Sequence, residues 1–157
     1  MFSLVQGLVQ SAQERPIRRV IMLGEEQCGK TTFLEAAKGL FDGGDPLKPE
    51  QIRPTVGLNV GKLKVKQVAV LLWDLGGKSS LRSIWDRYLD HAEGIIFVID
   101  ATNETQFLQA KVTLRSILAR ESMKDRPLLV FVNKQDVQND SNFPQQQQQQ
   151  QQQPQSS

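Results

Sequence analysis

One segment restricts the possible folds of this chain more than any other. Gly24 to Thr31 reads G-E-E-Q-C-G-K-T and follows an apolar run from Val20 to Leu23. The segment fits the template G-x-x-x-x-G-K-[ST] at every specified position. The apolar run predicts a buried strand, and the residues from Thr32 to Leu40 predict the helix after it. A strand that leads through a glycine-rich loop into a helix N-terminus is an anion site, so we expect a phosphate site at this point.

The residues of this loop have distinct expected tasks. Gly24 and Gly29 allow the backbone to lie close to a pyrophosphate, so that successive N–H groups point at it. Lys30 adds positive charge near the β and γ phosphates, and the hydroxyl of Thr31 is a suitable ligand for Mg²⁺. A glycine-rich turn is the alternative, but the strand, the spacing, Lys and Thr all favour a phosphate loop. The expected nucleotide-binding residues here are Gly24, Glu25, Glu26, Gln27, Cys28, Gly29, Lys30, Thr31 and Thr32.

A second motif, near the other end of the chain, indicates the base of the nucleotide. Asn133 to Asp136 reads N-K-Q-D and follows the apolar run Leu128 to Val132, another expected strand. The Asp136 carboxylate can accept hydrogen bonds from the N1–H and N2–H₂ edge of guanine, whereas adenine offers no such pair of donors. Asn133 can brace the loop and meet the base N7, and the stem of Lys134 can lie over the purine. Alone, the motif fits a solvated polar turn equally well; behind a phosphate loop it favours guanine.

A third motif lies between these two. Trp73 to Gly77 reads W-D-L-G-G, again after an apolar stretch. Asp74 is placed to hold Mg²⁺ through water, and Gly77 can donate its backbone N–H to a γ-phosphate. Thr55 lies in a loop-like stretch from Asp42 to Val56 that is long enough to fold over a nucleotide. Thr55 would close the Mg²⁺ shell only with a γ-phosphate present, which is the physical basis of a two-state switch. The expected metal ligands are Thr31, Thr55 and Asp74.

The order of segments predicts an α/β doubly wound sheet that is mostly parallel. Further strands are expected at Leu58 to Val65, Val68 to Trp73 and Gly94 to Asp100, with a helix from about Glu104 to Arg120. The short turn at Lys66 and Gln67 requires one antiparallel pair. The phosphate and base motifs then fall at the carboxyl ends of strands, where open α/β sheets bind their ligands.

With these motifs in order, the chain resembles a small GTPase of the ADP-ribosylation factor (Arf) and Arf-like family, within the P-loop NTPase fold. P-T-V-G-L-N-V-G from Pro54 and L-R-S-I-W-D-R-Y from Leu81 extend the resemblance, which spans residues 1 to about 140. It implies GTP or GDP and Mg²⁺ as ligands, GTP hydrolysis as the reaction, and an exchange factor, an activating protein and effectors as partners. It also implies that Leu58, Trp73 and Tyr88 form the apolar effector surface, Leu58 replacing the usual aromatic residue. For Leu58 and Trp73, core packing is an equally good expectation.

One departure from the family pattern falls at the catalytic position. The family has Gln directly after W-D-L-G-G, and this chain has Lys78. A Gln side chain carries a donor and an acceptor and can orient the attacking water, whereas a charged Lys only donates. The hypothesis is that hydrolysis is slow, intrinsically and with an activating partner, which favours a long-lived GTP state. The alternative, that Lys78 points to solvent in a mobile loop, would not restore the missing Gln.

A second departure lies at the end of the chain, where a glutamine run from Gln145 to Gln153 precedes Pro154. We expect an incomplete Arf-like GTPase domain at residues 15–140 and a disordered glutamine-rich tail at residues 141–157. The last guanine-contacting loop, of S-A-K type, and the last strand and helix of the family then have no counterpart. The fifth strand would be an exposed sheet edge, and a truncated product without function is one alternative.

The third departure concerns the membrane. Residues 1–14 are expected to form an N-terminal amphipathic helix, because Met1, Phe2, Val5 and Leu8 recur at near-helical spacing. Such a helix can lie in a bilayer interface. Phe2 replaces the Gly of an N-myristoylation signal and resembles the start of the Arf-related branch, which implies peripheral contact through residues 1–10. Packing of these residues back on the domain is the alternative. The expected place is the cytosolic face of a Golgi or related membrane.

Composition adds limits on the partners and on the redox chemistry. The formal net charge is only +2, so no bulk field favours nucleic acid. Cys28 is the sole cysteine, which excludes an internal disulfide. Backbone N–H groups of the phosphate loop could lower the pKa of the Cys28 thiol, although a side chain that only fills space is the more natural interpretation.

Taken together, the motifs and the resemblance favour a GTP-binding switch in Golgi and vesicle-mediated transport, with a hydrolysis-deficient GTP-holding module as the competing hypothesis.

Overall fold

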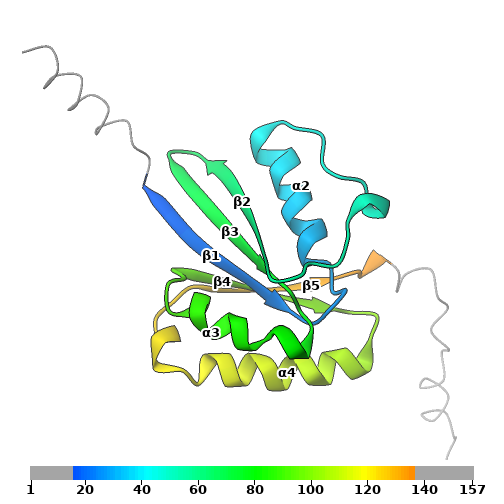
Figure 1. Ribbon diagram of the computed structural model, residues 1–157, viewed down its shortest axis with the longest axis vertical. Coiled ribbons are helices and arrows are strands. Elements are labelled where there is room, and N and C mark those ends of the chain that lie inside the picture. Colours follow the sequence, from blue (N-terminus) through cyan, green and yellow to red (C-terminus); the bar gives the residue numbers. More distant parts are fainter. Residues whose placement is uncertain (1–15, 137–157) are drawn as a thin grey trace, which may run out of the picture.

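The computed structural model describes residues 16–136, which form a five-stranded sheet with helices on both faces (Figure 1). The strand order is β2-β3-β1-β4-β5. β1 is parallel to β3 and β4, β4 is parallel to β5, and β2 is antiparallel to β3. The strands are β1 (Ile17–Gly24), β2 (Leu58–Val65), β3 (Val68–Leu75), β4 (Gly94–Asp100) and β5 (Leu128–Asn133). The expected α/β sheet, mostly parallel with one antiparallel pair, is confirmed.

The helices divide the core into two layers because the strand side chains alternate between the faces. α2 (Lys30–Asp42) covers one face, where Met22 and Val98 pack with Leu34. α3 (Ser83–Leu89) and α4 (Glu104–Leu118) cover the other face, where Ile21 and Phe97 pack with Trp85 (Figure 1). Residues 16–136 also contain three short 3₁₀ helices: η1 (Pro49–Gln51), η2 (Ser79–Leu81) and η3 (Glu121–Met123).

The observed elements follow the expected ones with a few differences. β2 and β4 have the expected bounds, whereas β3 continues past Trp73 to Leu75 and α4 ends at Leu118. No helix was expected at α3, because a seven-residue segment is too short to give a clear helical period. It forms because Trp85 and Leu89 bury their side chains in the core. In the described part of the chain, no helix is long and apolar enough to cross a membrane.

β5 lies at one edge of the sheet, as expected for the fifth strand. Leu129, Val130 and Val132 remain substantially exposed on it, while Phe131 packs against Phe33 of α2 with the ring centroids 5.1 Å apart. The expected N-terminal helix at residues 1–14 and the expected glutamine-rich tail at residues 141–157 lie outside the described residues.

Candidate functional site

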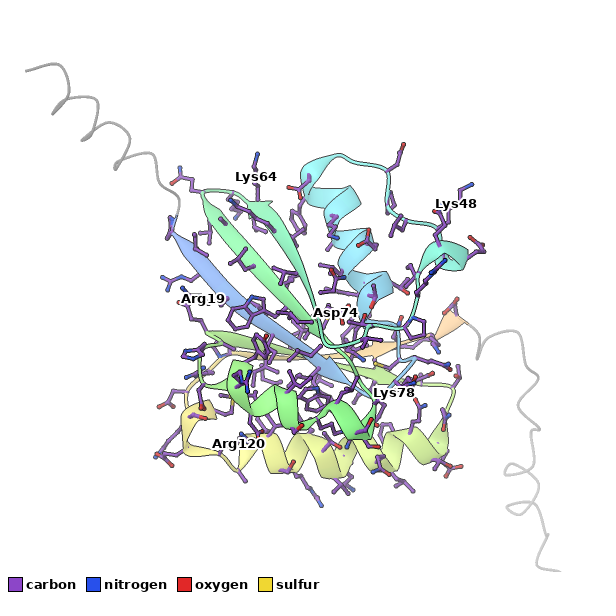
Figure 2. The ribbon with its side chains drawn as sticks, in the orientation of Figure 1. Arg19, Lys48, Lys64, Asp74, Lys78 and Arg120 are labelled. Atoms are coloured by element: carbon purple, nitrogen blue, oxygen red, sulfur yellow. The ribbon has the colours of Figure 1, made fainter. Side chains whose placement is uncertain are left out.

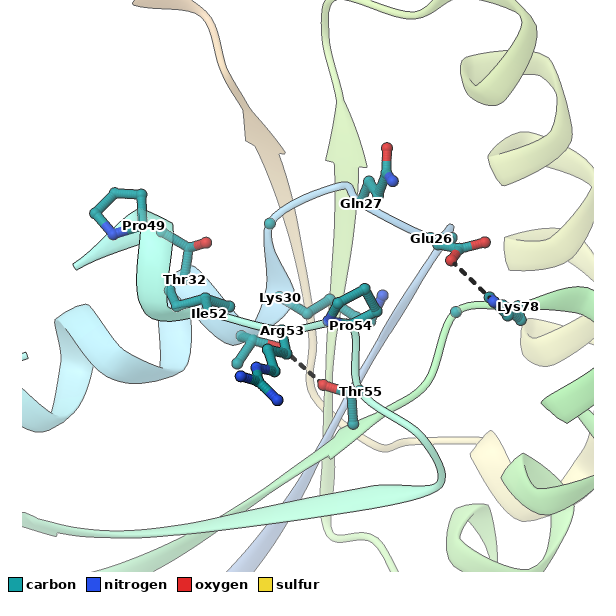
Figure 3. A pocket seen from close by; sticks show the side chains of 13 residues that line it. Glu26, Gln27, Lys30, Thr32, Pro49, Ile52, Arg53, Pro54, Thr55 and Lys78 are labelled. Atoms are coloured by element: carbon teal, nitrogen blue, oxygen red, sulfur yellow. Dashed lines mark hydrogen bonds and ion pairs between the residues drawn. The ribbon is translucent and has the colours of Figure 1, made fainter. Parts of the chain in front are cut away.

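The loops that carry the three motifs meet at one edge of the sheet. Register pairs Met22 with Asp74 and Asp100 with Asn133, so the carboxyl ends of the parallel strands lie side by side. A cavity of about 360 Å³ opens there (Figure 3). It is lined by Glu26, Gln27, Gly29, Lys30, Thr31, Thr32, Pro49, Ile52, Arg53, Pro54, Thr55, Gly77 and Lys78. The phosphate loop, the 42–56 loop and the segment after β3 thus share one pocket, with the 42–56 loop over it as expected.

The phosphate loop has a backbone that only glycine fits at two points. Gly24 and Gly29 have positive φ angles of 149° and 98°. A Cβ at Gly24 would overlap the carbonyl oxygen of Val98, and a Cβ at Gly29 would overlap Nδ2 of Asn133. Both glycines therefore permit close approach of the loop to neighbouring strands, which the Cβ of any other residue would prevent.

Lys30 begins α2 and turns back over the loop. Its Nζ donates to the carbonyl oxygens of Gly24 at 3.1 Å and Glu25 at 2.8 Å, and the residue is almost fully buried. The side chain therefore places a positive charge at the opening of the phosphate loop.

Cys28 is fully buried in the same loop. Burial raises the pKa of its thiol, although Lys30 nearby acts in the opposite direction. The suggested lowering of this pKa by the loop is therefore wrong, because desolvation of the thiolate outweighs the local positive charge. Cys28 is a small apolar side chain in the core rather than a reactive thiolate.

Three oxygen donors converge beside Lys30. The hydroxyl of Thr31 donates to Oδ2 of Asp74 at 2.6 Å, and the hydroxyl of Thr55 lies 3.3 Å from the same oxygen and 2.9 Å from Thr31 Oγ1. Figure 2 shows Asp74 in the middle of the molecule. Its side chain is fully buried, which raises its pKa despite the hydrogen bond from Thr31, and its Oδ1 has no partner among residues 16–136. One carboxylate and two hydroxyls around an unpartnered oxygen are hard donors that fit Mg²⁺.

The N-K-Q-D motif begins at the last residue of β5 and contacts the phosphate loop there. Asn133 donates from Nδ2 to the carbonyl oxygen of Cys28 at 2.9 Å, so it braces the phosphate loop as expected. Lys134 has a left-handed backbone with φ of 61° and pairs through Nζ with Oδ2 of Asp100 at 2.6 Å. Asp136 is exposed at the end of the described residues. The motif is therefore placed next to the loop, with one carboxylate pointing to solvent.

Asp100 is a site residue that the sequence did not indicate. Burial by itself would raise the pKa of Asp100, but the hydrogen bonds from Lys134 and Thr102 outweigh it and the pKa lies below its usual value. A lowered carboxyl pKa contributes stability above the unfolded-state pKa of about 3.9, and the contribution is lost as the pH falls through the folded-state pKa.

We therefore expect Asp100→Asn to lower the free energy of unfolding by about 1–3 kcal/mol at neutral pH, because Lys134 loses a charged acceptor. The difference from wild type should shrink once the pH falls below the unfolded-state value of about 3.9, and it should be lost as the pH falls through the lowered folded-state pKa of Asp100. Urea denaturation at a series of pH values measures it. A difference that stays constant down to pH of about 2 would show that the ion pair is not its cause.

The residue after Gly77 is also paired. Nζ of Lys78 lies 3.6 Å from Oε1 of Glu26, and Figure 3 shows the two side chains facing each other across the pocket rim. Gly77 itself lies against the loop backbone, because a Cβ there would be 2.5 Å from Glu26 N. Lys78 is thus not simply a solvent-directed side chain; it forms a partly exposed ion pair with the phosphate loop.

Comparison with known proteins identifies the family. A model of the ADP-ribosylation factor family matches residues 1–154. The chain belongs to this family. ADP-ribosylation factor-related protein 1 of Homo sapiens is 35% identical over 145 residues, which cover 92% of this chain and 72% of that protein. ADP-ribosylation factor-like protein 3 of Saccharomyces cerevisiae is 37% identical over 140 residues, covering 88% and 70%.

A solved structure has the same fold. It is the Arl6 BBS3 small GTPase from Trypanosoma brucei with the bound nucleotide analogue GppNp, at a TM-score of 0.60 and 22% identity, covering 74% of this chain and 86% of that chain. Arf-family small GTPases are GTP hydrolases, so this Arf-family protein is a GTPase by class.

The expected effector residues of this GTPase are half-buried at the edge of the core. Leu58, Trp73 and Tyr88 all pack against the layer beneath α3 and α4. The rings of Trp73 and Tyr88 meet edge to face, with centroids 5.4 Å apart. The three side chains therefore form one cluster that combines core packing with an accessible outer side.

The structure also reveals a buried polar group that the motifs did not indicate. Glu25 was expected among the nucleotide-binding residues of the phosphate loop, and no partner was expected for its side chain. That side chain is buried and pairs with Arg82, while Thr113 of α4 contacts both. Arg82 is 57 positions from Glu25 and Thr113 is 88. No local pattern signals contacts over such separations, so only the fold brings them together.

Proposed function

We propose that this Arf-family GTPase is a guanine-nucleotide-dependent molecular switch that acts at a Golgi or related membrane. The observation that carries the proposal is the convergence of Thr31, Thr55 and Asp74 beside Lys30. These residues come from the phosphate loop, the 42–56 loop and β3, so a ligand at this point contacts all three segments. A ligand that orders two loops at one point can bias their conformations.

The pocket suits the phosphates of GTP or GDP, and the polar motif beside it suits the base. Backbone N–H groups of residues 24–32 would surround the phosphates, with Lys30 adding charge near the β and γ positions. Asp136 would accept from the guanine edge and the stem of Lys134 would lie over the ring. Mg²⁺, held by Thr31, Thr55 and Asp74 directly or through water, would neutralise the charge that develops on the phosphates.

The switch follows from which atoms contact the γ-phosphate. Thr55 and the N–H of Gly77 would both be held in place with GTP and released with GDP, because only GTP offers the terminal phosphate. Thr55 lies just before β2, and Gly77 follows β3. Alternation of side chains along the β2–β3 hairpin allows its register to shift by pairs of residues. Leu58 and Trp73 lie on this hairpin, Tyr88 of α3 packs against Trp73, and the three side chains would present the effector surface.

Hydrogen exchange measured separately with bound GDP and with a non-hydrolysable GTP analogue tests the switch. Backbone amides at residues 52–58 and 76–82 should exchange more slowly with the GTP analogue, while α2 and β1 should exchange equally in both states. Equal exchange of both loops in the two states would exclude a switch at this site.

The proposed reaction is slow GTP hydrolysis, because Lys78 stands where the family has Gln. We expect Lys78→Gln to raise the single-turnover rate of phosphate release about tenfold or more, since an amide can orient the attacking water and a charged amine cannot. Lys124→Gln removes a similarly exposed lysine from an exposed ion pair with Glu121 and should leave the rate unchanged. Equal rates for wild type and Lys78→Gln would contradict this assignment.

The Lys78–Glu26 pair also favours the second candidate function, a module that holds GTP and presents it to effectors with little hydrolysis. With GTP bound, a wild-type hydrolysis rate no higher than that of free GTP, together with a higher rate for Lys78→Gln, would favour this candidate.

Membrane contact in vesicle-mediated transport is proposed from the apolar spacing of residues 1–10 and from the family. Sedimentation with liposomes should recover the GTP-analogue form of the full chain more strongly than a form without residues 1–14. Equal recovery of the two forms would remove residues 1–10 from the proposal.

A further inference from the structure

Glu25 is an acidic residue inside a loop that is proposed to hold phosphates. Its side chain is almost fully buried, because only 9% of the residue is exposed. A buried carboxylate beside an anionic ligand is unfavourable unless a cation compensates it. The structure places such a cation against it, from the segment that follows β3.

Arg82 is this cation, and it joins three separate elements. Its Nη2 pairs with Oε2 of Glu25 in the phosphate loop, and its Nη1 donates to the hydroxyl of Thr113 in α4 at 3.0 Å. The Thr113 hydroxyl in turn donates to Oε1 of Glu25 at 3.3 Å. The guanidinium also lies 5.4 Å from the ring centroid of Trp85. Both oxygens of Glu25 are therefore engaged, and the guanidinium has partners on two sides.

This contact links the segment from Gly76 to Arg82 to the phosphate loop. Trp85 donates from Nε1 to the carbonyl oxygen of Gly76 at 3.1 Å, and Gly77 lies directly against the backbone of Glu25 and Glu26. If the segment moved away from the loop, Glu25 would be left without its guanidinium in a buried place. Removing one partner of a buried pair is strongly unfavourable, so the pair opposes this movement.

We propose that Glu25, Arg82 and Thr113 form a clamp that holds the segment after β3 against the phosphate loop and thereby sets the preference of the protein for GTP over GDP. The three are positioning residues: they hold Gly77 where its N–H meets a γ-phosphate. GDP has no group at that point, so the clamp favours GTP selectively. This inference rests on the proposed guanine-nucleotide binding.

The test uses the full chain, fluorescent GDP and a fluorescent non-hydrolysable GTP analogue. Each variant is scored by its ratio of GTP-analogue affinity to GDP affinity, which cancels effects common to both nucleotides. Arg82→Met and Glu25→Gln should each lower this ratio about tenfold, and the double variant should lower it no further than either alone, because residues of one contact are not additive. Thr113→Val should lower it in the same direction by a smaller factor.

Simple electrostatics predicts a different pattern. Removing the negative charge of Glu25 would favour the more highly charged GTP, so Glu25→Gln would raise the ratio, and Arg82→Met would lower it. The two effects would then cancel in the double variant. A raised ratio for Glu25→Gln, or cancellation in the double variant, overturns the clamp.

Arg120→Met is the matched control. Arg120 pairs with Asp86 of α3, but this pair is exposed and does not touch the phosphate loop. Arg120→Met should leave the ratio within about twofold of wild type, since exposed pairs contribute little.

Thermal unfolding with GDP bound verifies that each variant is folded. A variant that fails this check is replaced by Arg82→Lys, which keeps the charge but loses the two-sided contact and should also lower the ratio. Failure of wild type to bind either nucleotide overturns the proposed function and the clamp together. Wild-type binding with an unchanged ratio in every variant overturns the clamp alone.

Discussion

Replacement of Asp136 by Asn should lower the affinity for GTP about a hundredfold or more. The carboxylate is expected to accept two hydrogen bonds from guanine, and bonds to charged groups are each worth about 1.5–3 kcal/mol. The amide of Asn can accept only one of them and turns a donor toward the base. The same amide should improve binding of xanthosine triphosphate, because xanthine carries a carbonyl where guanine has its amino group. Competition against fluorescent GDP measures both affinities.

Asp125→Asn is the control for this substitution. Asp125 is also exposed and lies in a turn with φ of 62°, a backbone that Asn tolerates well. It precedes β5, whereas the motif lies at the other end of that strand. It should leave both affinities unchanged. If Asp136→Asn bound GTP as tightly as wild type, the base would have to be recognised elsewhere and the assignment of Asp136 would be wrong.

Replacement of Gly29 by Ala should abolish nucleotide binding at micromolar concentrations. A Cβ at this position would overlap the side-chain amide of Asn133, and the φ of 98° is a conformation that alanine rarely adopts. Asn133 would have to leave the carbonyl oxygen of Cys28, which it now holds at 2.9 Å. The change would therefore displace the phosphate loop and the guanine motif together. Isothermal titration with GDP and with GTP measures the loss.

Gly44→Ala provides a matched control, because it makes the same chemical change in the 42–56 loop where no atom lies within 4 Å of an added Cβ. We expect it to bind nucleotide like wild type. Retained binding by Gly29→Ala would show that the loop relaxes without cost and that the contact with Asn133 does not shape the site.

Local sequence was sufficient for the strands and for the edge of the sheet that carries the site. The apolar runs ending at Leu23 and Val132 lie in parallel strands, and the turn at Lys66 and Gln67 joins the one antiparallel pair. These features depend on residues close together in the chain, where apolar runs and tight turns are informative. The same holds for Thr31 and Asp74, because Thr31 follows a recognisable strand and Asp74 lies near the end of one, each within a spaced motif.

The remaining features depend on contacts between distant parts of the chain. The side chain of Glu25 gave no sign of Arg82 or Thr113, because these residues meet only when α3 and α4 pack beside the phosphate loop. Asp100 gave no sign of Lys134, because only the parallel register of β4 and β5 brings them together. Cys28 was placed in an electropositive loop by its neighbours in sequence, but its burial beneath Gly24 decides the direction of its pKa. Such outcomes depend on which groups are removed from water, and that is a property of the fold.

The central claim is that residues 16–136 contain a working guanine-nucleotide site. The most direct test is titration of the purified full chain with fluorescent GDP and GTP in Mg²⁺, with unlabelled ATP in large excess as competitor. We predict saturable binding that resists ATP and is displaced by unlabelled GTP, because Asp136 and Asn133 distinguish guanine from adenine. Displacement by ATP as effective as displacement by GTP, or no binding of either guanine nucleotide, would contradict the claim.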